Sequence, residues 1–249
     1  MNVVYNDMAR HPFAPTAAAM PGRIDAVLSG LEEYPRIQPS LKWMGLAEDL
    51  AYQVHDSRYI GGLPANLYRY AIASAASALY AADLALHREM AFAVTNPPGH
   101  HAGRSKSWGF CYMNNMALAV AYLQRYLPRI IVVDLDMHTG DGSEALLRAP
   151  RAIYYHAAHG TRTSLIKELR FFLREQNGFA LGISAGFDNG RFDWGNLLSY
   201  EDYYLIGRDL GWFARSKCRG RLFLVLEGGY NQHVLGRHVR SLIDGIERG

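Results

Sequence analysis

The chain has 249 residues, 49% hydrophobic and 20% charged, with 26 basic residues, 23 acidic residues and a formal net charge of +3. This composition excludes an intrinsically disordered chain and gives no support to nucleic-acid binding. Apolar runs stay well short of the roughly 20 residues of a membrane-spanning helix. The N-terminus lacks the pattern of a secretory signal, and two distant cysteines favour a reducing compartment. We therefore expect one domain over residues 1–249 in a cytoplasmic protein that binds neither nucleic acid nor membranes.

The first half of the chain predicts two short strands and three helices. Ala and Leu are strong helix formers, and they dominate one long segment that has room for one break. The Asn-Pro-Pro-Gly run at 96–99 is a strong breaker and ends the second strand. The expected elements are a strand over Asn2–Tyr5, helices over Gly22–Leu31 and Asn66–Met90, a strand over Ala91–Thr95 and a buried helix over Cys111–Tyr126.

The second half predicts four more strands. Arg129–Asp134 is β-branched and apolar on both faces, which is typical of a central parallel strand. Similar runs occupy Ala152–Ala157, Phe179–Ser184 and Leu222–Leu226. Ser199 and Asp202 have the spacing of a capping box before one helix, and a last helix is expected over 234–246. Alternating strands and helices predict an α/β fold, with a mainly parallel central sheet flanked by helices on both faces and ligands bound beyond the carboxyl ends of its strands.

Acidic residues gather where these strands end. Asp134, Asp136 and His138 are spaced by two, so an extended chain points their side chains the same way. Asp188 follows another strand. Because a buried carboxylate needs a partner or a cation, Asp136, His138 and Asp188 could hold Zn²⁺ through two oxygens and one nitrogen, with one position left for water and substrate. The alternative is that Asp134 and Asp136 cap helices or turns.

Two further clusters could serve such a metal. His100 and His101 follow the Asn-Pro-Pro-Gly run and could be ligands, bases or surface residues. Asp134 and Asp141 are available to orient their imidazoles, and a carboxylate behind a histidine fixes its tautomer and raises its basicity. Tyr230 follows two glycines after the last strand. It is either a core aromatic after a turn or a phenol on a flexible glycine hinge, placed to donate a hydrogen bond to a developing oxyanion.

These clusters resemble a known family. The motifs PPGHHAG (97–103), GFCYMNN (109–115), DLDMHTGDG (134–142), SAGFD (184–188) and LEGGY (226–230) are similar to those of zinc-dependent histone deacetylases and their bacterial relatives. Val54–Tyr59 resembles the family's HD-x-x-Y segment, and residues 21–23 resemble its early Pro/Arg turn. TNPPGHHAGR and EGGYNQHVLG look most like the acetylpolyamine amidohydrolase branch. The resemblance spans nearly the whole chain and implies the arginase/deacetylase-like fold.

The resemblance also implies a role for each matching residue. Asp136, His138 and Asp188 would bind one Zn²⁺, with Fe²⁺ as the alternative ion. His101 would be the general base and then the general acid, oriented by Asp141, while His100 with Asp134 would supply electrostatic help. Tyr230 would polarise the scissile carbonyl. Gly109 and Phe110 would line the channel for an acyl-lysine type of chain.

The sequence departs from the family in four places. Thr139 replaces the second histidine of the D-x-H-H motif, at a position that is not a metal ligand in the family. In the segment 157–160, Ala157 replaces a serine that helps to hold a structural K⁺ or Na⁺ near Asp134, which argues against that cation. Only 23 residues separate His159 from Ile183, where relatives carry a longer stretch, and the segment between Tyr59 and Asn66 is also short. A compact variant is expected, with an open pocket or one completed by another subunit of a homo-oligomer.

The expected function is hydrolysis of an N-acyl amide, above all N-acetyl, on a small amine such as a polyamine or on an acetyl-lysine side chain. One alternative is a catalytically impaired homologue that binds ligands without turnover. Another is an arginase-type ureohydrolase, which needs two manganese ions and a D-x-H-x-D run. Here the acid after His138 is Asp141, three residues on, so the residues for a second metal are missing.

Overall fold

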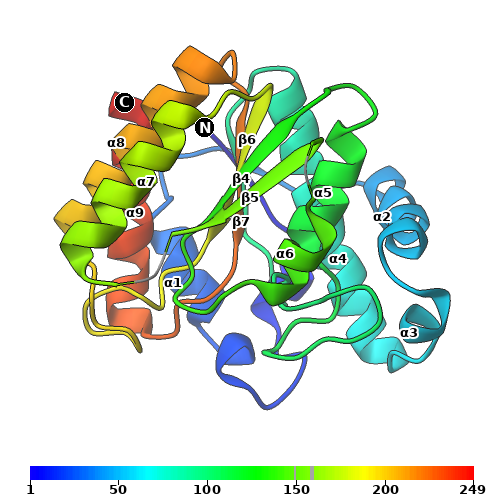
Figure 1. Ribbon diagram of the computed structural model, residues 1–249. Helices are drawn as coiled ribbons and strands as arrows, with labels where there is room; N and C mark the ends of the chain where they lie inside the picture. Colours follow the sequence, from blue (N-terminus) through cyan, green and yellow to red (C-terminus); the bar gives the residue numbers. More distant parts are fainter. Residues whose placement is uncertain (149, 158–159) are drawn as a thin grey trace.

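Seven strands form one parallel sheet in the computed structural model, which describes residues 1–148, 150–157 and 160–249 (Figure 1). The strands are β1 (Asn2–Val4), β2 (Arg36–Ile37), β3 (Ala91–Ala93), β4 (Ile130–Asp134), β5 (Ala152–His156), β6 (Ala180–Ala185) and β7 (Leu222–Leu226). Their order is β2-β1-β3-β7-β6-β4-β5, and every neighbouring pair is parallel. The prediction of a parallel α/β sheet is confirmed, and all the carboxyl ends share one edge.

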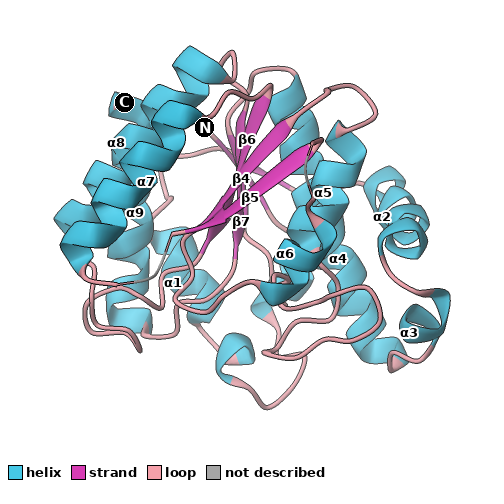
Figure 2. Cartoon of the chain, viewed as in Figure 1, coloured by secondary structure: helices cyan, strands magenta, loops and turns pink. Residues whose placement is uncertain are grey.

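Helices cover both faces of the sheet, as Figure 2 shows. Two short 3-10 helices, Asp7–Arg10 and Ala17–Ala19, come before α1. The α-helices are α1 (Arg23–Ser29), α2 (Leu41–Val54), α3 (Ser57–Gly61), α4 (Ala65–Leu86), α5 (Asn115–Leu123), α6 (Asp141–Leu146), α7 (Arg162–Glu175), α8 (Tyr200–Lys217) and α9 (Gln232–Arg248). On one face lie α1, α7, α8 and α9, while α2, α4 and α5 cover the other (Figure 1).

The central strands contribute alternate side chains to two hydrophobic cores. In β4, Ile131 and Val133 join the core under α8 and α9, while Ile130 and Val132 join the core under α4 and α5. Successive side chains of a strand point to opposite faces, so a strand buried on both sides must be apolar throughout. This is why the β-branched run 129–134 predicted a central strand correctly.

Some elements differ from the sequence prediction. The long helix α4 is unbroken, and α5 begins at Asn115 rather than Cys111 because the Asn114 side chain accepts the backbone N–H of Ala117 at 2.8 Å and caps the helix there. The capping box of Ser199 and Asp202 at the start of α8 is confirmed. The elements β2, α2, α3, α6 and α7 were not predicted.

Two features of the described chain bear on membranes and on disulfides. None of the helices in the described part of the chain combines the length and hydropathy needed to cross a lipid bilayer. Cys111 and Cys218 are both buried and unpaired. The single domain, the cytoplasmic location and the oligomeric state stay predictions.

Helices α8 and α9 pack against each other at glycines. A Cβ added to Gly207 or Gly211 would lie 2.2 Å from the carbonyl oxygen of Leu242 or Ile246, and one added to Gly245 would lie 2.1 Å from that of Tyr204. These distances place the two backbones in direct contact. Because α8 follows β6 and α9 follows β7, the contact also sets the spacing of the two loops that leave those strands.

Candidate metal and catalytic site

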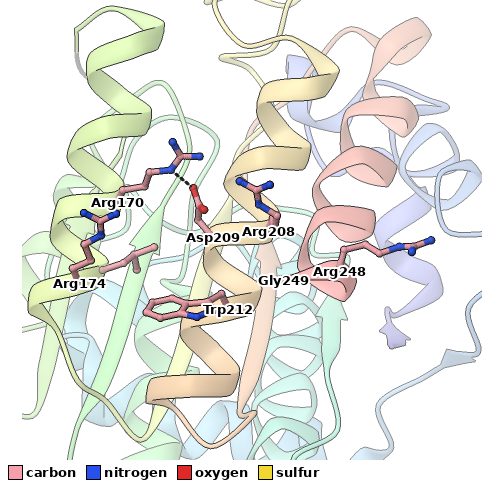
Figure 3. Close-up of a pocket in the computed structure, with 8 residues that line it drawn as sticks. Arg170, Arg174, Arg208, Asp209, Trp212, Arg248 and Gly249 are labelled. Atoms are coloured by element: carbon pink, nitrogen blue, oxygen red, sulfur yellow. Dashed lines mark hydrogen bonds and ion pairs between the residues drawn. The ribbon is translucent and has the colours of Figure 1, made fainter.

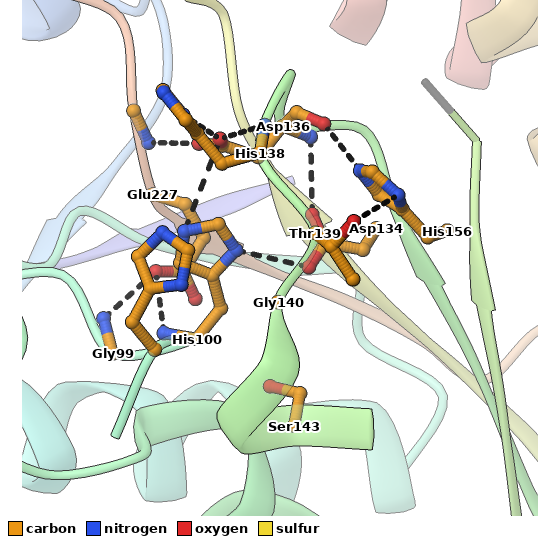
Figure 4. A network of polar contacts seen from close by, with 12 residues as sticks. Gly99, His100, Asp134, Asp136, His138, Thr139, Gly140, Ser143, His156 and Glu227 are labelled. Atoms are coloured by element: carbon orange, nitrogen blue, oxygen red, sulfur yellow. Dashed lines mark hydrogen bonds and ion pairs between the residues drawn. The ribbon is translucent and has the colours of Figure 1, made fainter. Parts of the chain in front are cut away.

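Asp136 and His138 follow the carboxyl end of β4 (Figure 4) and lie together with Asp188, which follows the neighbouring strand β6. His138 Nδ1 is 3.0 Å from Asp136 Oδ1 and 3.0 Å from Asp188 Oδ2. One donor atom from each residue lies within 4.8 Å of the others. The structure therefore brings together the three side chains that the sequence singled out as metal ligands.

The electrostatics of this cluster favour a bound cation. Asp136 and Asp188 are buried. Burial, and then the charge of Asp136, raises the pKa of Asp188 to about 7. Hydrogen bonds to Asp136 and Asp188 raise the pKa of His138 to about 10. The two buried carboxylates of Asp136 and Asp188 thus share one positive partner, the imidazole of His138. Its Nδ1 carries one proton, which cannot form a good hydrogen bond to both carboxylates. This set of two oxygens and one nitrogen fits a divalent cation such as Zn²⁺.

The end of β7 closes the cluster from a third side. The backbone N–H of Gly228 donates to Asp136 Oδ2 at 2.8 Å. A Cβ at this position would stand 2.5 Å from Asp136 Oδ2 and 2.8 Å from Asp188 Oδ2. Any side chain would fill the space between the carboxylates, so the close approach requires glycine.

The histidine pair lies beside the cluster, and each ring has the acid expected for it. His100 Nδ1 is 3.1 Å from Asp134 Oδ2, and His101 Nδ1 is 2.8 Å from Asp141 Oδ1. Burial and the neighbouring charge of His100 lower the pKa of His101 despite Asp141. A neutral His101 is therefore available near pH 7 to accept a proton, as a general base requires.

His100 takes the opposite charge state. Its burial alone would lower its pKa, but the charges of Asp136 and Asp134 raise the pKa of His100 well above its usual range. His100 Nε2 lies 3.8 Å from Asp136 Oδ1, next to the metal cluster (Figure 4). The two adjacent imidazoles thus differ in pKa. The neutral His101 suits a general base, and the protonated His100 suits a group that stabilises nearby negative charge.

Tyr230 is held by the backbone on either side of it. Arg23, fully buried, donates from Nε to the carbonyl of Gly229 at 2.8 Å, and Asp193 Oδ2 accepts the N–H groups of Tyr230 and Asn231, each at 2.8 Å. These bonds fix the segment that the sequence suggested as a flexible hinge. Burial, and then the charge of Asp136, raises the pKa of Tyr230, so its phenol stays protonated and can donate a hydrogen bond.

Gly109 and Phe110 lie against the two catalytic candidates. A Cβ on Gly109 would come within 2.4 Å of His101 Cδ2, and the Phe110 ring lies 6.0 Å from the Tyr230 ring. A cavity of about 280 Å³ is bordered by His101, Trp108 and Asp141 among others, and neither Gly109 nor Phe110 lines it. The positions suit a wall of the substrate channel, and substrate binding by Gly109 and Phe110 stays a prediction.

The described residues around Asp134 do not fit a structural monovalent cation. Asp134 Oδ1 accepts the N–H of Asp136 at 3.0 Å, and its Oδ2 accepts the Tyr154 hydroxyl at 2.8 Å. The carbonyl of Asp136 lies 2.8 Å from His156 Nε2 (Figure 4). Ala157 offers no hydroxyl. Ala158 and His159, from the same predicted motif, lie outside the described residues.

Two important residues had no role in the sequence prediction. Glu227 is buried, and its Oε2 accepts the N–H groups of Gly99 at 2.7 Å and His100 at 3.1 Å. It therefore anchors the turn that carries both histidines. Its place directly after a strand was the available signal. Arg23 was noted as part of a turn, but its hydrogen bonds to the carbonyls of Gly229 and Glu227 span more than 200 positions of the chain, and no local pattern reveals them.

The position of Asp141 also separates two classes of enzyme. Its carboxylate accepts hydrogen bonds from His101 and from the indole of Trp108. It does not join the three-residue group of Asp136, His138 and Asp188 among the described residues. The group offers ligands for one cation, whereas an arginase-type site would need acids for two.

A parallel α/β sheet with this ligand group and an acid-paired histidine couple at its carboxyl edge defines an arginase/deacetylase-like protein. Comparison with a solved structure agrees. The acetylpolyamine aminohydrolase of Burkholderia pseudomallei superposes with a TM-score of 0.78 at 20% identity, over 99% of this chain and 98% of that chain. This likeness establishes the fold.

Sequence comparisons give the family. A histone deacetylase domain model matches residues 61–166. The acetylpolyamine amidohydrolase of Burkholderia pseudomallei is 40% identical over 221 residues, which cover 73% of this chain and 63% of that protein. That of Mycoplana ramosa is 27% identical over 217 residues, covering 71% and 62%. The chain belongs to the histone deacetylase and acetylpolyamine amidohydrolase family. It spans less than two thirds of the length of these relatives.

Proposed function

We propose that this protein is a zinc-dependent amidohydrolase that removes an N-acetyl or similar acyl group from a small amine or a lysine side chain. The observation that carries the proposal is the convergence of Asp136, His138 and Asp188 beside the His101–Asp141 pair. The name of the two relatives, acetylpolyamine amidohydrolase, supports an acetylated amine as the substrate.

The side chains of the site have complementary tasks in this reaction. A bound divalent cation supplies a Lewis acid and lowers the pKa of the attacking water toward about 7. His101, oriented by Asp141, accepts the proton of that water as it attacks the amide carbon and returns a proton to the leaving amine. The Tyr230 hydroxyl donates to the oxygen on which negative charge develops. The products are a carboxylic acid and a free amine.

The decisive experiment is a substrate screen of the zinc-loaded protein. Acetylated lysine peptides, acetylpolyamines and other N-acyl amines are offered, and the released acid is measured. Asp188→Asn should lose zinc and activity, because it keeps the shape of the side chain and removes one ligand charge. Asp49→Asn, at an exposed position, is the matched control and should behave as wild type. Full zinc occupancy without hydrolysis of any substrate would favour a homologue that binds ligands without turnover.

A further inference from the structure

Two half-exposed tryptophans cover the two rings that the proposed reaction uses. Trp108 and Trp194 are 54% and 53% exposed. We propose, resting on the proposed function, that both are positioning residues: Trp108 fixes the His101–Asp141 pair, and Trp194 fixes the ring of Tyr230. Neither tryptophan belongs to a hydrophobic core of the described residues, so a role in general stability does not account for them.

Trp108 contacts both members of the histidine–acid pair. Its ring centroid lies 3.8 Å from that of His101 at an interplanar angle of 33°. Its indole N–H lies 3.1 and 3.0 Å from the two oxygens of Asp141, and Asp141 Oδ1 lies 2.8 Å from His101 Nδ1. The Asp141 side chain is 49% exposed. The indole therefore gives this carboxylate a fixed donor where water would otherwise let it rotate.

The chain turns sharply directly after Trp108. Gly109 and Phe110 both adopt positive φ angles, 57° and 66°. A left-handed conformation is uncommon for phenylalanine and costs conformational energy. At this turn Trp108 stacks on the His101 ring, Gly109 lies against its Cδ2 atom, and the Phe110 ring lies 6.0 Å from that of Tyr230. The strained turn thus accompanies the contact between Trp108 and the imidazole of His101.

Trp194 makes the equivalent contact with Tyr230. The two rings stack at 4.0 Å with an interplanar angle of 27°, and the Trp194 ring lies 6.2 Å from that of His138. The preceding residue, Asp193, holds the backbone N–H groups of Tyr230 and Asn231. A single dipeptide in the β6–α8 loop thus fixes both the backbone and the ring of a residue in the β7–α9 loop.

The first test uses steady-state kinetics of the zinc-loaded protein. Trp108→Phe keeps a ring and removes the indole N–H, whereas Trp108→Leu removes both contacts. A displacement of about 1 Å in a catalytic group can cost about 100-fold in rate. We expect kcat to fall about 10-fold for Trp108→Phe and about 100-fold for Trp108→Leu, with KM nearly unchanged. Trp194→Leu should also lower kcat by about 10- to 100-fold.

The pH profile separates positioning of His101 from a merely structural effect. Without Trp108, His101 is better solvated and Asp141 lacks one hydrogen bond to its charged form. Both changes favour the protonated imidazole. The acid limb of kcat/KM should therefore move to higher pH in the Trp108 variants and stay in place in Trp194→Leu.

A matched control lies on α8. Trp212 is 48% exposed and borders a groove of about 530 Å³ between α7 and α8, with arginines around it (Figure 3). No predicted site residue lines this groove. Trp212→Leu removes an equally exposed indole and should leave kcat, KM and the acid limb unchanged.

A double-mutant cycle tests how Trp194 acts. If Trp194 works by placing the Tyr230 hydroxyl, Trp194→Leu should add little to the loss already caused by Tyr230→Phe. Near-UV circular dichroism reads the stacked rings without turnover. Trp194→Leu and Tyr230→Leu should each remove the same band, and the double variant should remove no more than either.

The outcomes keep the two proposals apart. If wild type hydrolyses acylated amines and the variants of Trp108 and Trp194 keep its kcat and acid limb, the positioning proposal is wrong and the proposed function stands. If zinc-loaded wild type hydrolyses nothing, the proposed function is wrong. In that case the dichroism still tests the ring contact. If the double variant lost the sum of the bands lost by Trp194→Leu and Tyr230→Leu, the stacking of Trp194 on Tyr230 would be wrong as well.

Discussion

Replacing Gly228 with alanine should abolish tight metal binding while the protein stays folded. The new methyl carbon would stand 2.5 Å from Asp136 Oδ2 and 2.8 Å from Asp188 Oδ2. Carbon and oxygen atoms approach to about 3.3 Å even in close contacts, so the two oxygens must retreat by roughly 0.8 and 0.5 Å. Metal ligands tolerate deviations of about 0.2 Å. We expect zinc affinity to fall by at least about 100-fold, equivalent to about 2.8 kcal/mol.

The assay is a chelator competition that gives the zinc Kd of each variant, with thermal unfolding of the metal-free protein measured in parallel. Gly45→Ala is the control, because a Cβ at Gly45 in α2 meets nothing within 4 Å. It should bind zinc like wild type and gain up to about 1 kcal/mol in stability. Wild-type zinc affinity in a folded Gly228→Ala variant would show that the end of β7 does not close the metal cluster.

Other groups of the site give predictions of their own. Tyr230→Phe should lower kcat by about 100- to 1000-fold and His101→Ala by about 100- to 10,000-fold, with the zinc content unchanged; unaltered kcat in either variant would remove its assigned role. Zinc affinity should rise between pH 6 and 8, because the pKa values of Asp188 (about 7) and His138 (about 10) leave protons that zinc must displace. Calorimetry in two buffers of different ionisation enthalpy should detect these released protons, and a pH-independent affinity would contradict the ligand assignment. Exchange of K⁺ and Na⁺ for tetramethylammonium should leave the melting temperature and kcat unchanged, because protein groups bind both oxygens of Asp134; a clear drop in either would reveal a bound monovalent ion.

The metal cluster could be predicted because its signals are local. The buried strand 129–134 needs apolar residues on both faces, so the acids placed directly after it stand out. The predicted strand matches β4 within one residue. The rule that parallel strands share a carboxyl edge then brings Asp188 toward Asp136 without knowledge of any contact.

The missed helices had weaker or misleading signals. In α7, Leu165, Leu169 and Leu173 recur every four residues and are buried. This spacing indicates a helix, but the segment was predicted only as a stretch shorter than that of relatives. The apolar run after Gly109 suggested a helix from Cys111. The helix begins at Asn115 instead, because the Asn114 side chain caps it there.

The contacts that the two tryptophans make with distant segments could not be predicted. The indole of Trp108 meets Asp141 33 positions later, and Trp194 stacks on Tyr230 36 positions later. Each pair depends on which strands become neighbours in the sheet and on how their loops leave it. A single sequence contains no local pattern for such meetings.

The glycine contacts between α8 and α9 extend the reach of the site to the opposite end of the molecule. At Gly207, Gly211 and Gly245 the backbones of the two helices are in direct contact. The loops that carry Asp188 and Tyr230 lead directly into these helices. A bulkier residue at any of these glycines would push the helices apart and shear the metal ligand away from the phenol. Loss of activity would then map to a buried contact between two helices, away from the metal and catalytic residues.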